Sequence, residues 1–156
     1  MYQDWQVERW ETPVSDVKSL AMVSLTDCQG HLTIIVQDLR DPQRRRFQFT
    51  FEQYPAYRNI MEEYRMELWT YLDRAGFHCG WTMRVQDAPW SRELKQEPVV
   101  AVANPTLQHY MICTEDDVIE VLANAAPTII EIAPADAEEA LPGKSIIYYV
   151  SRGNTT

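Results

Sequence analysis

The sequence predicts a single α+β domain, built as a mostly antiparallel, twisted sheet with one long helix on one of its faces. Two patterns carry this prediction: phenylalanines that alternate with polar residues in the first third of the chain, and apolar residues at helical spacing over residues 55–75. A length of 156 residues suits one domain. The sequence contains no repeat or linker that would divide it, so we expect residues 1–156 to fold as one unit.

The first third of the chain is predicted to form an extended lead-in and then an antiparallel meander. Residues 1–17 contain Pro13, which disfavours a continuous helix. Residues 18–26 and 31–38 are apolar segments separated by turn-forming residues at 27–30. The strand that follows has the clearest period-two pattern, with three rings on one face: Phe47, Phe49 and Phe51.

The long helix is predicted over residues 55–75. Pro55 stands where a first helical turn favours proline, and Gly76 stands where a helix commonly ends. We expect the helix to lie across the phenylalanine face of the sheet, because both surfaces are apolar. Its apolar residues recur at helical spacing: Tyr57, Ile60, Met61, Tyr64, Leu68, Tyr71, Leu72 and Ala75.

The second half of the chain is predicted to contain shorter elements. Residues 77–86 alternate as a strand does, and Pro89 opens a short helical turn. Residues 107–133 are apolar around the acidic segment 114–117, and they suit either a helix that begins with a capping threonine or a hairpin that turns at this segment. An acidic loop, a terminal strand and a frayed tail at residues 153–156 complete the prediction.

The charge of the chain is negative and unevenly distributed. Fourteen basic and 23 acidic residues give a formal net charge of −9, and residues 115–139 contain eight acids and no Lys or Arg. A negative field repels phosphate backbones, so we expect no direct nucleic-acid binding. It favours a basic protein partner, although an acidic surface also serves solubility alone.

The sequence indicates a cytoplasmic protein without a membrane partner. It contains no apolar run near the ~20 residues that span a bilayer. Its polar, acidic N-terminus does not resemble a secretory signal. Three widely spaced cysteines without a Cys-x-x-Cys pair fit a reducing compartment.

Motifs of known chemistry are missing from the sequence. It has no glycine-rich phosphate loop, no Gly-x-Ser-x-Gly elbow and no His-Glu-x-x-His helix. Each histidine has a cysteine nearby, which would suit a zinc site. However, neighbours such as His78 and Cys79 point to opposite faces of a strand, and His109 and Cys113 would lie about 13 Å apart. We therefore expect no catalytic site, no metal and no cofactor.

The predicted site is a partner-binding surface made of acidic side chains and one tryptophan. Trp90 follows a proline in a segment that we expect to be exposed, and aromatic side chains dominate interface energetics. The predicted residues are Glu115, Asp116, Asp117, Glu120, Asp136, Glu138, Glu139 and Trp90.

Three segments also resemble a known class of protein. They are YRNI at 57–60, VQDAPW at 85–90, and HYMI at 109–112 followed by DDVIEVLA at 116–123. Their order and spacing are similar to those of small bacterial cytosolic proteins that act as immunity proteins in toxin–immunity systems. Ala88 departs from the small polar residue expected there. The resemblance implies a binding role, and it favours the hairpin over the helix after residue 107.

Three hypotheses of function follow. The first is a non-enzymatic protein-binding protein, of the immunity type, that inhibits a basic toxin or nuclease. The second is a small enzyme or ligand-binding domain with a pocket between helix and sheet. The third is a structural component that assembles as a homo-oligomer through an exposed strand edge.

Overall fold

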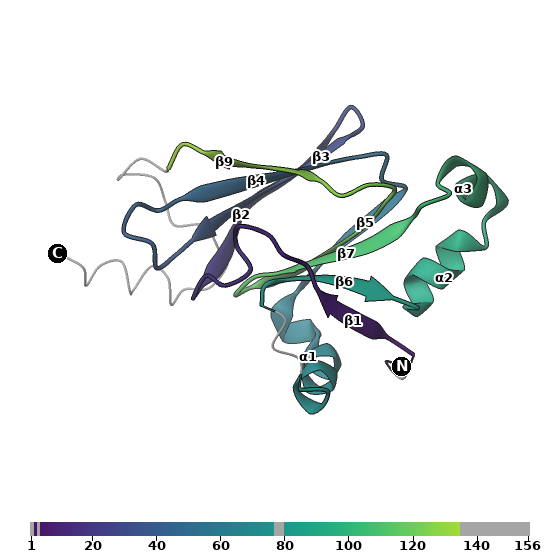
Figure 1. The fold of residues 1–156 in the computed structure, drawn as a ribbon, viewed down its shortest axis with the longest axis horizontal. Coiled ribbons are helices and arrows are strands. Elements are labelled where there is room, and N and C mark those ends of the chain that lie inside the picture. Colours follow the sequence, from purple (N-terminus) through teal and green to yellow (C-terminus); the bar gives the residue numbers. More distant parts are fainter. Residues whose placement is uncertain (1, 3, 77–79, 135–156) are drawn as a thin grey trace.

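The computed structural model describes residue 2, residues 4–76 and residues 80–134, and within them nine strands form two antiparallel sheets. The strand orders are β1-β6-β7-β8-β5 and β2-β3-β4-β9 (Figure 1). The strands are β1 (Gln6–Arg9), β2 (Leu20–Cys28), β3 (His31–Asp38), β4 (Arg46–Glu52), β5 (Ala56–Met61), β6 (Thr82–Gln86), β7 (Gln108–Cys113), β8 (Asp117–Ala123) and β9 (Thr128–Ile132). The helices are the 3₁₀ turn η1 (Glu62–Tyr64), α1 (Met66–Arg74), α2 (Pro89–Lys95) and α3 (Pro98–Ala103).

The fold is mostly β, so the predicted α+β class with one long helix is wrong. Strands make up 44% of the described residues and helices about 19%. Residues 56–61 form β5 instead of the first turns of a helix, and only the short η1 and α1 are helical in the predicted range. In the described part of the chain, no helix is long and apolar enough to cross a bilayer.

Residues 56–61 form strand β5 because a strand in this place pairs with β8 and brings a cation to the buried Glu120. All six of its residues pair with β8, and Arg58 lies directly opposite Glu120. The Glu120 carboxylate is fully buried and needs a cation within reach, which the strand register provides. Tyr64, predicted to lie on the apolar face of the helix, is exposed at the junction of η1 and α1, and so is Met66.

The predicted meander is confirmed, and its phenylalanine face forms the main core. β2 pairs with β3, and β3 pairs with β4, where Phe49 lies opposite Ile34. The five-stranded sheet covers these rings, in the place where the long helix was expected. Phe49 contacts Trp10, which in turn contacts Tyr110 of β7 at a ring-centroid distance of 4.9 Å. Burying each such ring contributes about 1.5–3 kcal/mol.

The hairpin after residue 107 is confirmed. β7 and β8 pair in register, and Thr114 closes the turn between them. The Asp117 backbone N–H donates to the Thr114 hydroxyl at 3.0 Å, and the Thr114 N–H donates to the Asp117 carbonyl at 2.8 Å. The threonine that could have capped a helix therefore closes a hairpin. β9 crosses to the four-stranded sheet and pairs with β4.

Helix α1 covers only part of the outer face of the five-stranded sheet, the face turned away from the main core. Its buried Leu68 and Leu72 belong to a second apolar cluster with Met83, Met111 and Val118. Helix α2 begins after β6, where Ala88 is fully buried. The part of the outer face between these two helices carries polar side chains, and the candidate site lies there.

Candidate functional site

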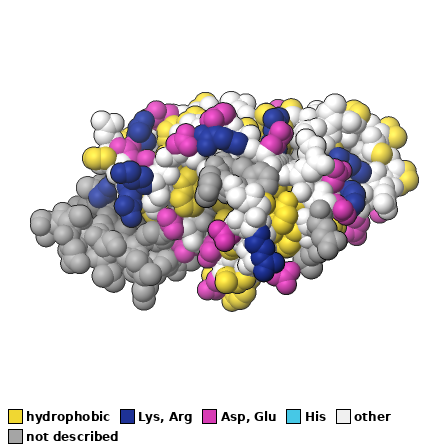
Figure 2. All heavy atoms as spheres, turned by 60° about the horizontal axis from the view of Figure 1, so that its bottom comes forward, with side chains coloured by type: hydrophobic (Ala, Val, Ile, Leu, Met, Phe, Trp, Pro, Cys, Tyr) yellow, Lys and Arg dark blue, Asp and Glu magenta, His cyan; other side chains and the backbone are white. Residues whose placement is uncertain are grey.

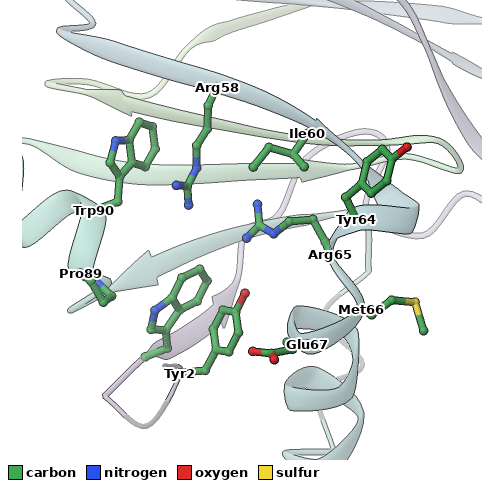
Figure 3. Close-up of a pocket in the computed structure, with 10 residues that line it drawn as sticks. Tyr2, Arg58, Ile60, Tyr64, Arg65, Met66, Glu67, Pro89 and Trp90 are labelled. Atoms are coloured by element: carbon green, nitrogen blue, oxygen red, sulfur yellow. The ribbon is translucent and has the colours of Figure 1, made fainter.

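A cleft of about 590 Å³ opens on the outer face of the five-stranded sheet, between β5, the start of α1 and the start of α2. We call it the arginine cleft. In Figure 3, Arg58 from β5 and Arg65 at the start of α1 extend toward one another, and Trp90 of α2 lies beside Arg58. Its lining includes Tyr2, Trp5, Arg58, Tyr64, Arg65 and Trp90.

A fully buried glutamate holds the two arginines in place. The Arg58 Nε donates to Glu120 Oε2 at 2.6 Å, and Nη2 donates to Oε1 at 3.1 Å. The Arg65 Nη1 donates to Oε2 at 2.6 Å, and His109 Nε2 hydrogen-bonds to Oε1 at 3.0 Å. The carboxylate therefore accepts four hydrogen bonds, and a buried charge requires such partners to be stable.

The electrostatics of this group keep Glu120 ionised. Burial opposes its charge, but the hydrogen bonds from His109 and Arg58 and the charge of Arg65 outweigh burial and hold the pKa of Glu120 well below its usual range. Burial likewise opposes the charge of Arg65, and attraction to Glu120 outweighs it, so the pKa of Arg65 is raised. Glu120 is therefore ionised at neutral pH, beside the charged Arg65.

Aromatic rings frame the polar cluster. The Arg58 guanidinium lies 4.3 Å from the centroid of the Trp90 ring, a cation–π distance. Trp90 and Trp5 both contact the His109 ring edge-on, at centroid distances of 5.5 and 6.0 Å. Tyr2 packs against Trp5 at 4.7 Å. These rings exclude water from one side of the cluster and fix the planes of the charged groups.

Three buried titratable groups in or near the cleft, Glu120, His109 and Cys113, are poorly placed for acid–base or nucleophilic chemistry. Both oxygens of Glu120 already accept two hydrogen bonds each, and its lowered pKa makes it a poor base. His109 is 2% exposed and lies behind the tryptophans, and its Nδ1 has no hydrogen-bond partner among the described residues. The buried Cys113 thiol has its pKa raised by burial, so it is not a ready nucleophile.

The rim of the cleft is apolar and exposed. The Tyr64 and Met66 side chains are 71% and 66% exposed, and Figure 3 shows both at the end of the cleft opposite Trp90. Glu67 also lies on the rim and is exposed. Trp, Tyr, Met and Arg are the side chains that are enriched in protein interfaces.

The predicted acidic surface is only partly a surface. Glu115 is exposed and Asp116 is half-buried at the tip of the β7–β8 hairpin, whereas Asp117 and Glu120 are 1% and 0% exposed. Burial removes these last two residues from any partner-binding face, because β8 lies inside the five-stranded sheet, between β7 and β5, with all its residues buried. The other predicted acids lie outside the described residues: Asp136, Glu138 and Glu139.

Two further acids join the exposed part of that surface. The Glu62 backbone N–H donates to the Asp116 carbonyl at 2.9 Å, so η1 lies against the hairpin tip. We call Glu62, Glu63, Glu115 and Asp116 the acidic end. On the face drawn in Figure 2, acidic and basic side chains lie side by side with hydrophobic ones exposed between them. That face does not carry a field of one sign.

Trp90 is the predicted residue that the structure brings into the cleft, half-buried at its wall. Sequence reasoning missed Arg58 and Arg65, and it weighed His109 only as a zinc ligand or as part of a pocket. One signal could have found them: Glu120 interrupts the apolar run DVIEVLA, and a charge inside a buried strand needs a cationic partner. In the described ranges, no group of three or more His, Cys, Asp or Glu side chains could hold a metal ion.

Comparison of the chain with protein-family models, with curated proteins and with solved structures yields no match.

Proposed function

We propose that this protein is a non-enzymatic binding protein and that a protein partner docks on the arginine cleft. The observation that carries the proposal is the combination of a preorganised guanidinium pair with two highly exposed apolar side chains, Tyr64 and Met66, at the mouth of the same cleft. Inhibition of a toxin, in the manner of an immunity protein, is the biological use that we propose for this binding.

Two physical features support a protein partner. Tyr64 and Met66 line the mouth of the cleft and are 71% and 66% exposed, and exposed apolar side chains beside a cleft are typical of a protein-interaction surface. The guanidinium groups are held by Glu120 before any partner arrives, so docking does not have to order them. Interfaces gain most of their energy from a few such anchors.

The proposal is tested by comparing two double variants as bait in a host lysate. In the first, Tyr64→Ser and Met66→Ser remove the apolar rim. In the second, Val99→Ser and Val102→Ser remove equally exposed apolar side chains from α3 as a matched control. We expect a protein captured by the wild type and by the α3 variant to be lost from the rim variant. Equal capture by all three baits would refute docking on the cleft.

The acidic end offers a second candidate, a basic partner. The contact between η1 and the hairpin tip gathers four acids from two distant parts of the sequence, and such a cluster steers association with a positive surface. Charge reversal of Glu63 and Glu115 should then slow association with a basic partner and weaken its salt dependence. An unchanged association rate at low salt would exclude this candidate.

A further inference from the structure

We infer that the group recognised by the arginine cleft is an Asp or Glu side chain that stands next to a bulky apolar side chain in a segment of the partner. This inference rests on the proposed function and specifies the chemistry of its partner. Three features of the cleft lead to it: the hydrogen-bonding state of Arg58, the charge of the cluster, and the apolar walls.

Arg58 is bound on one side only. Its Nε and Nη2 donate to Glu120, and its Nη1 has no hydrogen-bond partner among the described residues. Its side chain is 33% exposed and its guanidinium lies against the Trp90 ring. A planar guanidinium that is already oriented and still has N–H groups to donate suits a second carboxylate.

The charge of the cluster matches a single negative charge. The guanidinium groups of Arg58 and Arg65 and the Glu120 carboxylate leave 2 − 1 = +1 on the floor of the cleft. A carboxylate brings −1 and neutralises this surplus, whereas a phosphoryl group brings about −1.5 to −2 and exceeds it. Glu67 on the rim repels any anion, and it repels a phosphoryl group more strongly than a carboxylate. The cleft should therefore prefer a carboxylate to a phosphate.

The apolar walls of the cleft indicate which kind of side chain should stand next to that carboxylate in the partner. Tyr2, Ile60 and Trp90 surround the guanidinium pair with apolar surface. An apolar side chain beside the acid would remove this surface from water, at about 25 cal/mol per Å². Nucleic acid is a poor alternative occupant, because the whole chain carries a formal charge of −9.

Four pools of hexapeptides test the inference. All are acetylated at the N-terminus and randomised at the positions that flank a central dipeptide. Three pools have an amidated C-terminus, and their central dipeptides are Phe-Glu, Phe-Gln and Phe-phosphoserine. The fourth pool has Phe-Gln at its centre and a free C-terminal carboxylate. Binding is followed by NMR through the Arg58 Nε–H and the Trp90 indole N–H. We expect saturable shifts with the Phe-Glu pool, and binding at least about tenfold weaker with Phe-Gln.

Other outcomes would overturn the inference. Equal shifts from the Phe-Glu and Phe-Gln pools, no shift from the Phe-Glu pool, or tighter binding of the phosphoserine pool would each exclude a specific acidic side chain. If the pool with the free C-terminal carboxylate binds more tightly than the Phe-Glu pool, the cleft recognises a C-terminal carboxylate and not an acidic side chain. The variant Arg58→Met should lose the preference for Phe-Glu, and Arg84→Met, at a paired arginine elsewhere on the same sheet, should retain it.

Failure of the inference and failure of the proposed function are distinguishable. If the rim variant loses its captured protein while the four pools bind alike, the cleft binds a protein without reading a carboxylate. If the Phe-Glu pool is preferred while the rim variant still captures the same protein, the cleft binds acidic peptides but is not the docking site of that partner.

Discussion

Replacing Glu120 by glutamine tests whether the buried cluster holds the outer face of the five-stranded sheet together. The substitution keeps the shape of the side chain and removes its charge. It leaves Arg65, whose side chain is 7% exposed, without a counter-charge, while Arg58 can still turn toward water. Breaking a buried ion pair by removing one partner destabilises a protein by about 3–5 kcal/mol.

We expect a value near the lower limit, about 3 kcal/mol, because the glutamine oxygen still accepts hydrogen bonds from the arginines. Typical domains have a free energy of unfolding of about 5–15 kcal/mol, so the loss is a large fraction of the total. For a chain of this size it corresponds to a fall in the midpoint of thermal unfolding of roughly 6–12 °C.

The assay is urea unfolding followed by tryptophan fluorescence, with Glu8→Gln as the matched control. Glu8 pairs with Arg84 at 3.0 Å on the same sheet, but both side chains are nearly half-exposed, so the control should lose less than about 1 kcal/mol. If Glu120→Gln and Glu8→Gln lower the free energy of unfolding equally, the buried cluster contributes no more than a surface pair, and the reasoning is refuted.

Three further predictions concern pH and backbone geometry. The pKa of Glu120 is lowered on folding, so its contribution to stability is present above the unfolded value near ~4.3 and is lost as the pH falls. Acid titration of stability should therefore be steeper for the wild type than for Glu120→Gln below about pH 5, and parallel curves would contradict this. Burial and the hydrogen bond that Tyr54 donates to Asp27 raise the pKa of Tyr54 to about 12. One tyrosine should thus ionise only near that pH in an ultraviolet titration, and its contribution to stability should be lost as the pH rises from about 10. Substituting Ala for Gly80 should cost several kcal/mol more than the same change at Gly30: both have positive φ, but only at Gly80 would a Cβ meet a backbone oxygen, at 2.2 Å. Equal urea midpoints for the two glycine variants would show that the backbone shifts freely.

Local pattern predicted β2, β3 and β4 well because these three strands follow one another through short connections and share one apolar face. It did not predict that β9 pairs with β4, because about 75 residues separate the two strands. Phe47, Phe49 and Phe51 alternate with polar residues, and that alternation alone places them in the core. The hairpin at Thr114 was accessible as one of two alternatives. In both of them the threonine hydroxyl accepts from the Asp117 N–H, and they differ in whether residues 118–123 pair with β7 or form a helix.

The prediction failed where a long-range partner decides the local structure. Tyr57, Ile60 and Met61 have helical spacing, but their backbone pairs with β8, which lies about 60 residues later in the sequence. If residues 56–61 formed a helix, they could not pair with β8, and Glu120 would lose its hydrogen bonds from Arg58. No window of sequence around residue 58 contains this information.

The sequence by itself therefore determined the period-two strands, their turns and the negative charge of the chain, because these depend on neighbours a few residues apart. Tertiary structure alone decided which acids are exposed. It buried Asp117 and Glu120 in a central strand and brought Arg58, Arg65 and Trp90 around the latter. The physical reason is that a charge can be buried only where distant segments supply its partners, and only the folded chain brings those segments together.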